Sequence, residues 1–129
     1  MASRPNPTEP DPVLAAFRKS IDNIDASTAF YGRLGLSVYS DHGRYRILTD
    51  GKGWHVHLSS EGPVGWVVPG RNPNGLYLYT ADVDGVADRI RDLLPGGGPS
   101  HRPWGMYEVS VSDPDGTLVR IGWPSRLMS

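Results

Sequence analysis

The chain changes its hydrophobic period in the middle of one segment, "GLYLYTADVDGVADRIRDLL", residues 75–94. The first residues alternate, with two leucines on one side and Tyr77 and Tyr79 on the other, which predicts a strand. After Asp82 the apolar residues recur at helical spacing and form one stripe. An amphipathic helix that directly follows a strand packs on the apolar side of its sheet, so we expect the tyrosines on the opposite face.

The same order of elements occurs earlier in the chain. "VLAAFRKSI" is a predicted strand, and "NIDASTAFYGRLG" is a predicted helix that Asp25 caps and Gly35 ends. Three predicted strands follow, "LSVYS", "YRILTD" and "WHVHLSS". Both halves contain a turn in which glycine follows an aspartate, Asp50 or Asp115, and the second helix is expected to stop at "PGGG". The pattern predicts two copies of one βαβββ unit and an α+β fold.

The length and composition are those of one ordinary domain. We expect the domain to cover 13–124, with module one at about 13–60 and module two at about 75–124. A segment rich in glycine and proline connects the modules. The first twelve residues, 1–12, contain four prolines and are expected to form a flexible tail. Residues 125–129 are expected to follow the domain as a C-terminal tail.

Charge and composition exclude several classes of function. The net charge of −1 gives no electrostatic reason to expect a nucleic acid or a membrane surface as partner. No apolar run is long enough to span a membrane and no signal peptide is evident, so we expect a cytoplasmic protein. The chain has no cysteine, which excludes disulfides, thiolate catalysis and cysteine-based metal sites.

Strand parity separates an apolar face from a polar one. The apolar face is predicted to bury the stripes of the two helices (Phe30, Leu34, Val86, Ile90 and Leu94), and its strand residues are Phe17, Ile21, Val56, Leu58, Tyr107, Val109, Val111, Val119, Ile121 and Trp123. The polar face collects Arg18, His55, His57, Tyr77, Tyr79, Glu108 and Arg120. A solvated sheet face and a binding surface are both consistent with this set. Aromatic, imidazole and guanidinium groups are typical of recognition sites and favour the binding surface.

Two segments carry a resemblance to a known family. "NIDASTAFYGRLGL" and "PWGMYEVSVSDPDGTLVRI", within two βαβββ units, resemble the vicinal oxygen chelate superfamily, which includes glyoxalase, extradiol dioxygenases, fosfomycin-resistance enzymes and bleomycin-binding resistance proteins. The resemblance extends from Val13 to about Pro124 and is greatest to the bleomycin-resistance-like branch. It implies two modules whose mixed sheet curls around a concave cavity, completed by a second subunit in a homodimer. Such a fold hosts both enzymes and pure binders.

Metal-dependent members of this superfamily place one ligand on each of four strands. By resemblance those positions fall at Ala16, His57, Gly75 or Leu76, and Arg120. Of these only His57 can bind a metal, and arginine at the fourth position would repel a dication. The resemblance therefore implies that the metal site of the superfamily has been lost and that no cofactor is needed.

An alternative metal site remains open on the polar face. His55 and His57, two residues apart on one strand, can bind a divalent transition metal jointly, with Glu108 as a third ligand. The corresponding function is a metal-dependent lyase, isomerase or dioxygenase that acts on vicinal oxygens. A metal-free enzyme with Glu108 or a histidine as general acid–base, and a protein-interaction domain with an unused polar face, are further alternatives.

The leading hypothesis is a metal-free homodimer that binds and sequesters an aromatic antibiotic. Tyr77 and Tyr79 are expected to form the floor of a stacking groove that faces the histidines and Arg120 across the curled sheet. Trp54, Trp66 and Trp104 are candidates for its rim, and Trp123 for the core. The predicted ligand-binding residues are Arg18, His55, His57, Tyr77, Tyr79, Trp104, Glu108 and Arg120.

Overall fold

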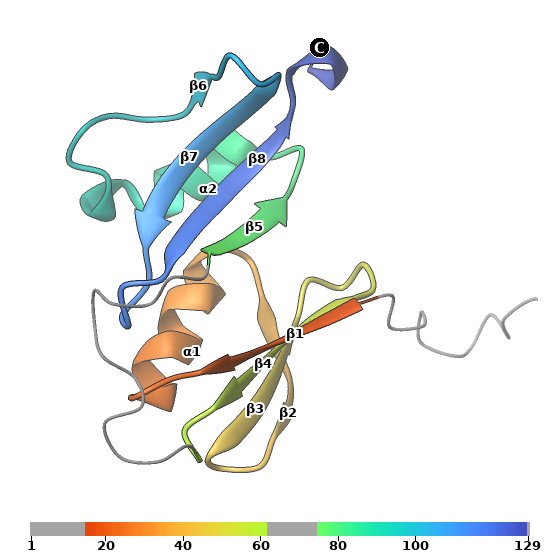
Figure 1. Ribbon diagram of the computed structural model, residues 1–129, viewed down its shortest axis with the longest axis vertical. Helices are drawn as coiled ribbons and strands as arrows, with labels where there is room; N and C mark the ends of the chain where they lie inside the picture. The colour runs from red at the N-terminus through yellow and green to blue at the C-terminus, as the bar shows by residue number, and fades with distance from the viewer. Residues whose placement is uncertain (1–14, 62–74, 129) are drawn as a thin grey trace, which may run out of the picture.

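The computed structural model describes residues 15–61 and 75–128, and it contains two four-stranded sheets, each with its own helix (Figure 1). Module one consists of β1 (Ala15–Ser20), α1 (Ile24–Arg33), β2 (Ser37–Asp41), β3 (Tyr45–Thr49) and β4 (Trp54–Ser59). Module two consists of β5 (Gly75–Tyr79), α2 (Val83–Arg89), the 3₁₀ turn η1 (Arg91–Leu93), β6 (Ser100–His101), β7 (Met106–Ser112) and β8 (Leu118–Pro124), and it is followed by the 3₁₀ turn η2 (Ser125–Leu127).

The two sheets have equivalent topology, which confirms the predicted α+β fold with a repeated βαβββ unit. Their strand orders are β1-β4-β3-β2 and β5-β8-β7-β6, and in each the first strand is parallel to its neighbour while the other pairs are antiparallel. The predicted tail 1–12 and Trp66 lie outside the described residues. No helix in the described part of the chain is long and apolar enough to cross a membrane.

The helix ends differ from the predicted ones in two places. Asn23, not Asp25, caps α1, because its side-chain oxygen accepts a hydrogen bond from the backbone N–H of Ala26 at 3.0 Å. Asp25 instead forms an ion pair with Arg46 of β3 at 2.7 Å. The helix α2 ends before the predicted glycine stop, since the chain tightens into η1 already after Ile90.

The core lies between each sheet and its helix. Parity placed Val56 and Leu58 of β4, and Val119 and Ile121 of β8, correctly, because all four are buried. The predicted helix residues Phe30, Leu34, Val86 and Ile90 are buried with them, and Leu94, Tyr107 and Trp123 pack on this cluster while partly exposed. Phe17 of β1, predicted on the same face, is only half-buried and lies outside the core cluster. The apolar face therefore holds the fold together, as the alternation predicted.

A buried ionic network joins the two modules. The ammonium of Lys19, on the apolar side of β1, lies 3.1 Å from Asp113 Oδ2 and 3.2 Å from Asp115 Oδ2, in the turn between β7 and β8. Tyr31 of α1 donates a hydrogen bond to Asp113 Oδ2 at 2.7 Å, and Ser27 donates one to Asp115 Oδ2 at 3.5 Å. All five side chains are buried, so module one surrounds the turn of module two with donors.

Candidate functional site

Tyr77, Glu108 and Gly122 meet on the polar face of module two. Tyr77 lies on β5, Gly122 on the neighbouring β8, and Glu108 on β7 directly opposite Gly122. The phenol of Tyr77 crosses β8 and donates a hydrogen bond to Glu108 Oε2 at 2.5 Å. A Cβ atom at position 122 would lie 2.2 Å from Tyr77 Oη. Glycine is therefore required at position 122 for Tyr77 to reach the carboxylate.

Glu108 is buried although the described helix of module two, α2, packs on the opposite face of the sheet. Its exposed fraction is 1%, and Arg120 Nη1 and Arg102 Nε lie 3.7 and 4.0 Å from its Oε1. Burial, and then the hydrogen bond to Glu108, raise the pKa of Tyr77 well above its ordinary value. The phenol consequently keeps its proton and acts as a fixed donor to the carboxylate.

Exposed aromatic rings border this arrangement. Tyr79 is 62% exposed and Trp104 is 58% exposed. The rings of Tyr77 and Tyr79 are 5.0 Å apart, and the guanidinium of Arg120 lies 5.8 Å from the centre of the Trp104 ring. We refer to Tyr77, Tyr79, Trp104, Glu108 and Arg120 as the module-two cluster.

A second group of predicted residues lies on the polar face of module one. Arg18 of β1 is the register partner of His57 on β4, and His55 lies two residues before His57. Tyr45 of β3 forms a hydrogen bond with His57 Nδ1 at 2.7 Å, and Arg18 lies 5.8 Å from the centre of the Tyr45 ring. Tyr39 of β2 stacks on His55 with ring centres 4.7 Å apart. We refer to these five residues as the module-one cluster.

Burial is the largest influence on the pKa of His57. It lowers the pKa of the imidazole, and the nearby charges of His55 and Arg18 lower it further. The ring therefore stays neutral to lower pH than a free histidine. A neutral ring has one acceptor nitrogen, so Tyr45 can donate its phenolic proton to Nδ1 while Nε2 carries the hydrogen.

The predicted site residues thus form two clusters on two sheets. Among the residues that the structure describes, no hydrogen bond, ion pair or ring contact joins the module-one cluster to the module-two cluster. Tyr77 and Arg120 lie together, as predicted, because they are register partners on neighbouring strands. His55, Tyr77 and Tyr79 border one cavity, but no hydrogen bond or ring contact joins the histidines to the tyrosines within the described residues of one chain.

Because the two clusters lie on different sheets, the residues proposed as an alternative metal site, His55, His57 and Glu108, are also separated. His55 and His57 have ring centres 6.3 Å apart, and Glu108, on the other sheet, is already engaged by Tyr77 and two arginines. Within 15–61 and 75–128, no group of three histidine, aspartate or glutamate side chains is arranged to hold a metal ion. The alternative set does not fit a metal site formed by one chain.

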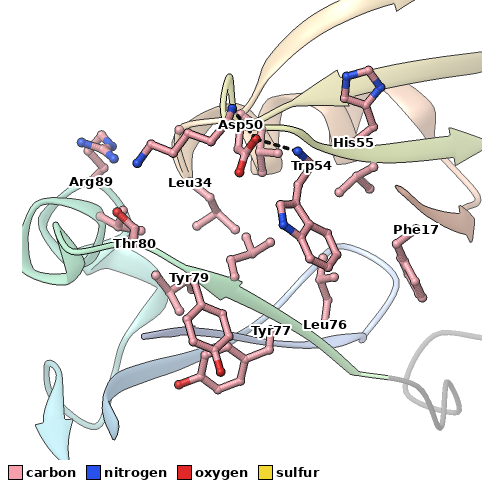
Figure 2. Close-up of a pocket in the computed structure, with 17 residues that line it drawn as sticks. Phe17, Leu34, Asp50, Trp54, His55, Leu76, Tyr77, Tyr79, Thr80 and Arg89 are labelled. Atoms are coloured by element: carbon pink, nitrogen blue, oxygen red, sulfur yellow. Dashed lines mark hydrogen bonds between the residues drawn. The ribbon is translucent and has the colours of Figure 1, made fainter. Parts of the chain in front are cut away.

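A cavity of about 480 Å³ separates the modules on the apolar side of the site (Figure 2). The indole of Trp54, which is 55% exposed, extends from β4 toward Leu76 of β5, while the hydroxyl ends of Tyr77 and Tyr79 point away from the cavity. The cavity is lined by residues of both modules: Phe17, Leu34, Gly35, Leu36, Asp50, Lys52, Trp54, His55, Val56, Leu76, Tyr77, Leu78, Tyr79, Thr80, Val86, Arg89 and Ile121. The leucines of β5, expected in the core, are only half-buried because they border this cavity.

Four residues of the two clusters and their surroundings did not follow from the sequence. One is Tyr39, which lies at a register irregularity of β2 that simple alternation does not predict. Tyr45 on β3 lies on the same face of the sheet as His57 on the neighbouring strand β4. Alternation along β3 would therefore have placed Tyr45 on the polar face. Arg102 lies just after the two-residue strand β6, in a loop with no periodicity that would place its side chain. Alternation along β8 places Gly122 on the polar face, but a glycine in a strand does not show which neighbouring side chain passes over it.

Comparisons with known proteins agree with this fold. The sequence profile of the glyoxalase/bleomycin resistance protein/dioxygenase superfamily matches residues 14–121. The bleomycin resistance determinant encoded on the transposon Tn5 has a TM-score of 0.69 and 22% identity, over 86% of this chain and 97% of its own. TnmS3, an antibiotic-binding protein from Streptomyces sp. CB03234, has a TM-score of 0.66 and 28% identity, over 85% and 93%.

An enzyme has a similar fold. Lactoylglutathione lyase from Agrobacterium tumefaciens has a TM-score of 0.64 and 24% identity, over 92% of this chain and 98% of its own. At these identities the Tn5 protein and the lyase show the fold alone, and the fold is common to binders and enzymes. No curated protein sequence matches the chain.

Proposed function

Because the chain belongs to the glyoxalase/bleomycin resistance protein/dioxygenase superfamily, we propose that it is a metal-free protein that binds and sequesters an aromatic small molecule, such as an antibiotic. The observation that carries the proposal is the module-two cluster. It presents exposed aromatic rings around a carboxylate that is already neutralised and hydrogen-bonded by its neighbours. The 28% identity to the antibiotic-binding TnmS3 supports the same class of ligand.

The cluster suits a flat aromatic ligand for two physical reasons. Each stacked ring pair contributes roughly 0.5–1.5 kcal/mol beyond the burial of apolar area, and Tyr79 and Trp104 both offer an exposed ring. The hydrogen bond between Tyr77 and Glu108 fixes one ring before the ligand arrives, so little side-chain entropy is lost on binding. This is preorganisation for binding and requires no reacting group.

We further propose that the binding unit is a homodimer with composite sites. Sequestration at micromolar protein concentration requires a binding free energy of about −9 to −12 kcal/mol, which one open sheet face does not provide. The module-one cluster offers a second face with Arg18, His55 and His57. A two-fold dimer places module one of one copy opposite module two of the other, and thereby forms two equal, enclosed sites.

The binding proposal is tested by titration of purified, metal-analysed protein with polycyclic aromatic antibiotics, followed by calorimetry and tryptophan fluorescence. We expect submicromolar binding by the wild type and loss of binding in Tyr77→Ala/Tyr79→Ala, with the fold retained by circular dichroism. Leu93→Ala, at an exposed position outside both clusters, is the matched control. Binding no tighter than millimolar by any aromatic ligand, or unchanged binding in the double variant, would overturn the proposal.

The composite site is tested by mixing two variants that each lack one half of it. Arg18→Ala/His57→Ala keeps module two intact, and Tyr77→Ala/Tyr79→Ala keeps module one intact. After equal subunit exchange, composite sites predict that about one quarter of all sites are again intact, because half of the dimers are mixed and each has one unaltered site. If each chain forms its own site, mixing restores nothing.

A further inference from the structure

Charge on the polar face of module two is unevenly balanced. Glu108 is the single acidic side chain on the described strands of this face, and two guanidiniums, of Arg102 and Arg120, lie within 4.0 Å of its Oε1. The acidic residues of α2 and η1 lie on the other side of the sheet, and Asp113 and Asp115 are paired with Lys19 in the core. Among the described residues, the face therefore carries one excess positive charge.

The two guanidiniums also have unused hydrogen-bond donors. Their distances to Glu108, 3.7 and 4.0 Å, are those of an ion pair and exceed a hydrogen bond. Glu108 Oε2 already accepts a hydrogen bond from the Tyr77 phenol. Arg120 Nε is buried and has no hydrogen-bond partner among the described residues. A guanidinium has five N–H donors, and the side chains of Arg102 and Arg120 are 41% and 40% exposed, so both can donate to an acceptor outside the chain.

The unused donors lie beside the aromatic rings. The guanidinium of Arg120 lies over Trp104, and its side chain and that of Arg102 both reach solvent. A ligand ring stacked at Trp104 or Tyr79 would bring its substituents next to these donors. The module-one cluster contributes Arg18, which hydrogen-bonds to Ser59 and has no acidic partner within 4 Å among the described residues. It therefore adds positive charge to a composite site.

Resting on the proposed binding function, we infer that the ligand is an aromatic anion. It is a fused-ring molecule with a carboxylate or phenolate oxygen to which Arg120 and Arg102 donate hydrogen bonds. An oxyanion can accept two parallel N–H bonds from one guanidinium, and the planar fork of arginine is suited to that geometry. The same guanidiniums repel an ammonium group. The site thereby discriminates against cationic aromatic ligands of equal size.

Three ligands that share one ring system test this inference: anthraquinone-2-carboxylate, anthraquinone-2-carboxamide and 2-(aminomethyl)anthraquinone. By calorimetry on the wild-type protein we expect the carboxylate to bind about tenfold more tightly than the neutral amide, or better, and the amine more weakly than both. The preference for the carboxylate should shrink as ionic strength rises. Equal affinities, or tightest binding of the amine, would overturn the inference while leaving the proposed function in place.

Substitutions assign the preference to the two arginines. In Arg120→Gln, and separately in Arg102→Gln, the affinity for the carboxylate should fall by a larger factor than the affinity for the amide, so that the ratio of the two affinities moves toward one. Arg126→Gln, at an exposed position in η2 with no ion pair among the described residues, is the matched control. A carboxylate preference that persists in both variants would contradict the assignment. If none of the three ligands binds any variant or the wild type, both the inference and the proposed function fail.

Discussion

Replacing Lys19 with methionine removes the one cation from the buried network between the modules. Methionine keeps the length and apolar stem of the side chain, so the change isolates the ammonium group. The carboxylates of Asp113 and Asp115, both within 3.2 Å of that ammonium, remain buried. Asp113 still accepts the hydrogen bond from Tyr31, but neither carboxylate retains a cationic partner within the described residues.

The expected loss of stability is large. Removing one partner of a buried ion pair costs about 3–5 kcal/mol, because a charge remains in a low-dielectric site. In a domain of this size that loss corresponds to a decrease in unfolding temperature of roughly 10–20 °C. Burial and the hydrogen bond to Asp113 raise the pKa of Tyr31 far above its ordinary value, so the phenol stays a neutral donor and cannot replace the lost charge.

Urea unfolding followed by circular dichroism measures the effect, with Lys52→Met as the control at an exposed lysine. Asp115→Asn and the double variant Lys19→Met/Asp115→Asn complete a double-mutant cycle. The double variant should lose less stability than the two single variants combined, since it removes both a cation and an anion. A cost below about 1 kcal/mol for Lys19→Met, or strictly additive effects, would refute the view that this network is a charge-dependent connection between the modules.

Three further predictions concern smaller changes. Gly122→Ala should displace the Tyr77 phenol, whose oxygen lies 2.2 Å from the new Cβ, and thereby weaken aromatic-ligand binding, which titration measures. His57 has a pKa below that of the unfolded chain, so the unfolded chain binds the extra proton first and stability falls as the pH drops below about 6.5. His57→Gln should reduce that fall, as urea unfolding at pH 7.5 and about 5.5 would show. Asp82→Ala removes the cap of α2 and should cost about 1 kcal/mol in thermal unfolding.

Local patterns predicted the layers of this fold because each layer is encoded within a few residues. Alternation in β4 and β8 placed Val56 and Ile121 in the core, and a helical stripe placed Val86 there. Lys19 has the parity of its apolar neighbours in β1, and its partners Asp113 and Asp115 lie more than ninety residues away along the chain. No local pattern relates residues at that separation, so the buried network was missed.

The candidate site was only partly predictable for a related reason. Parity along each strand correctly brought Tyr77 and Arg120 together, since neighbouring strands fix their register through backbone hydrogen bonds. The relation between Tyr77 and His57 depends on how two separate sheets are oriented, and strand parity contains nothing about that angle. The α1 cap shows a similar limit at smaller scale. Asn23 and Asp25 are both good capping residues, and the structure uses Asn23 while Asp25, in the first turn of the helix, forms an ion pair with Arg46.

The tyrosines of β5 have unequal roles, which alternation alone does not distinguish. Tyr77 turns inward across Gly122 and satisfies a buried carboxylate, whereas the ring of Tyr79, two residues later, is mostly exposed. Loss of the Tyr77 hydroxyl would leave Glu108 Oε2 short of a donor beside the guanidiniums of Arg102 and Arg120. Tyr77 thus sets the electrostatics of the face and Tyr79 supplies contact area, so the two substitutions should affect ligand charge preference and ligand affinity differently.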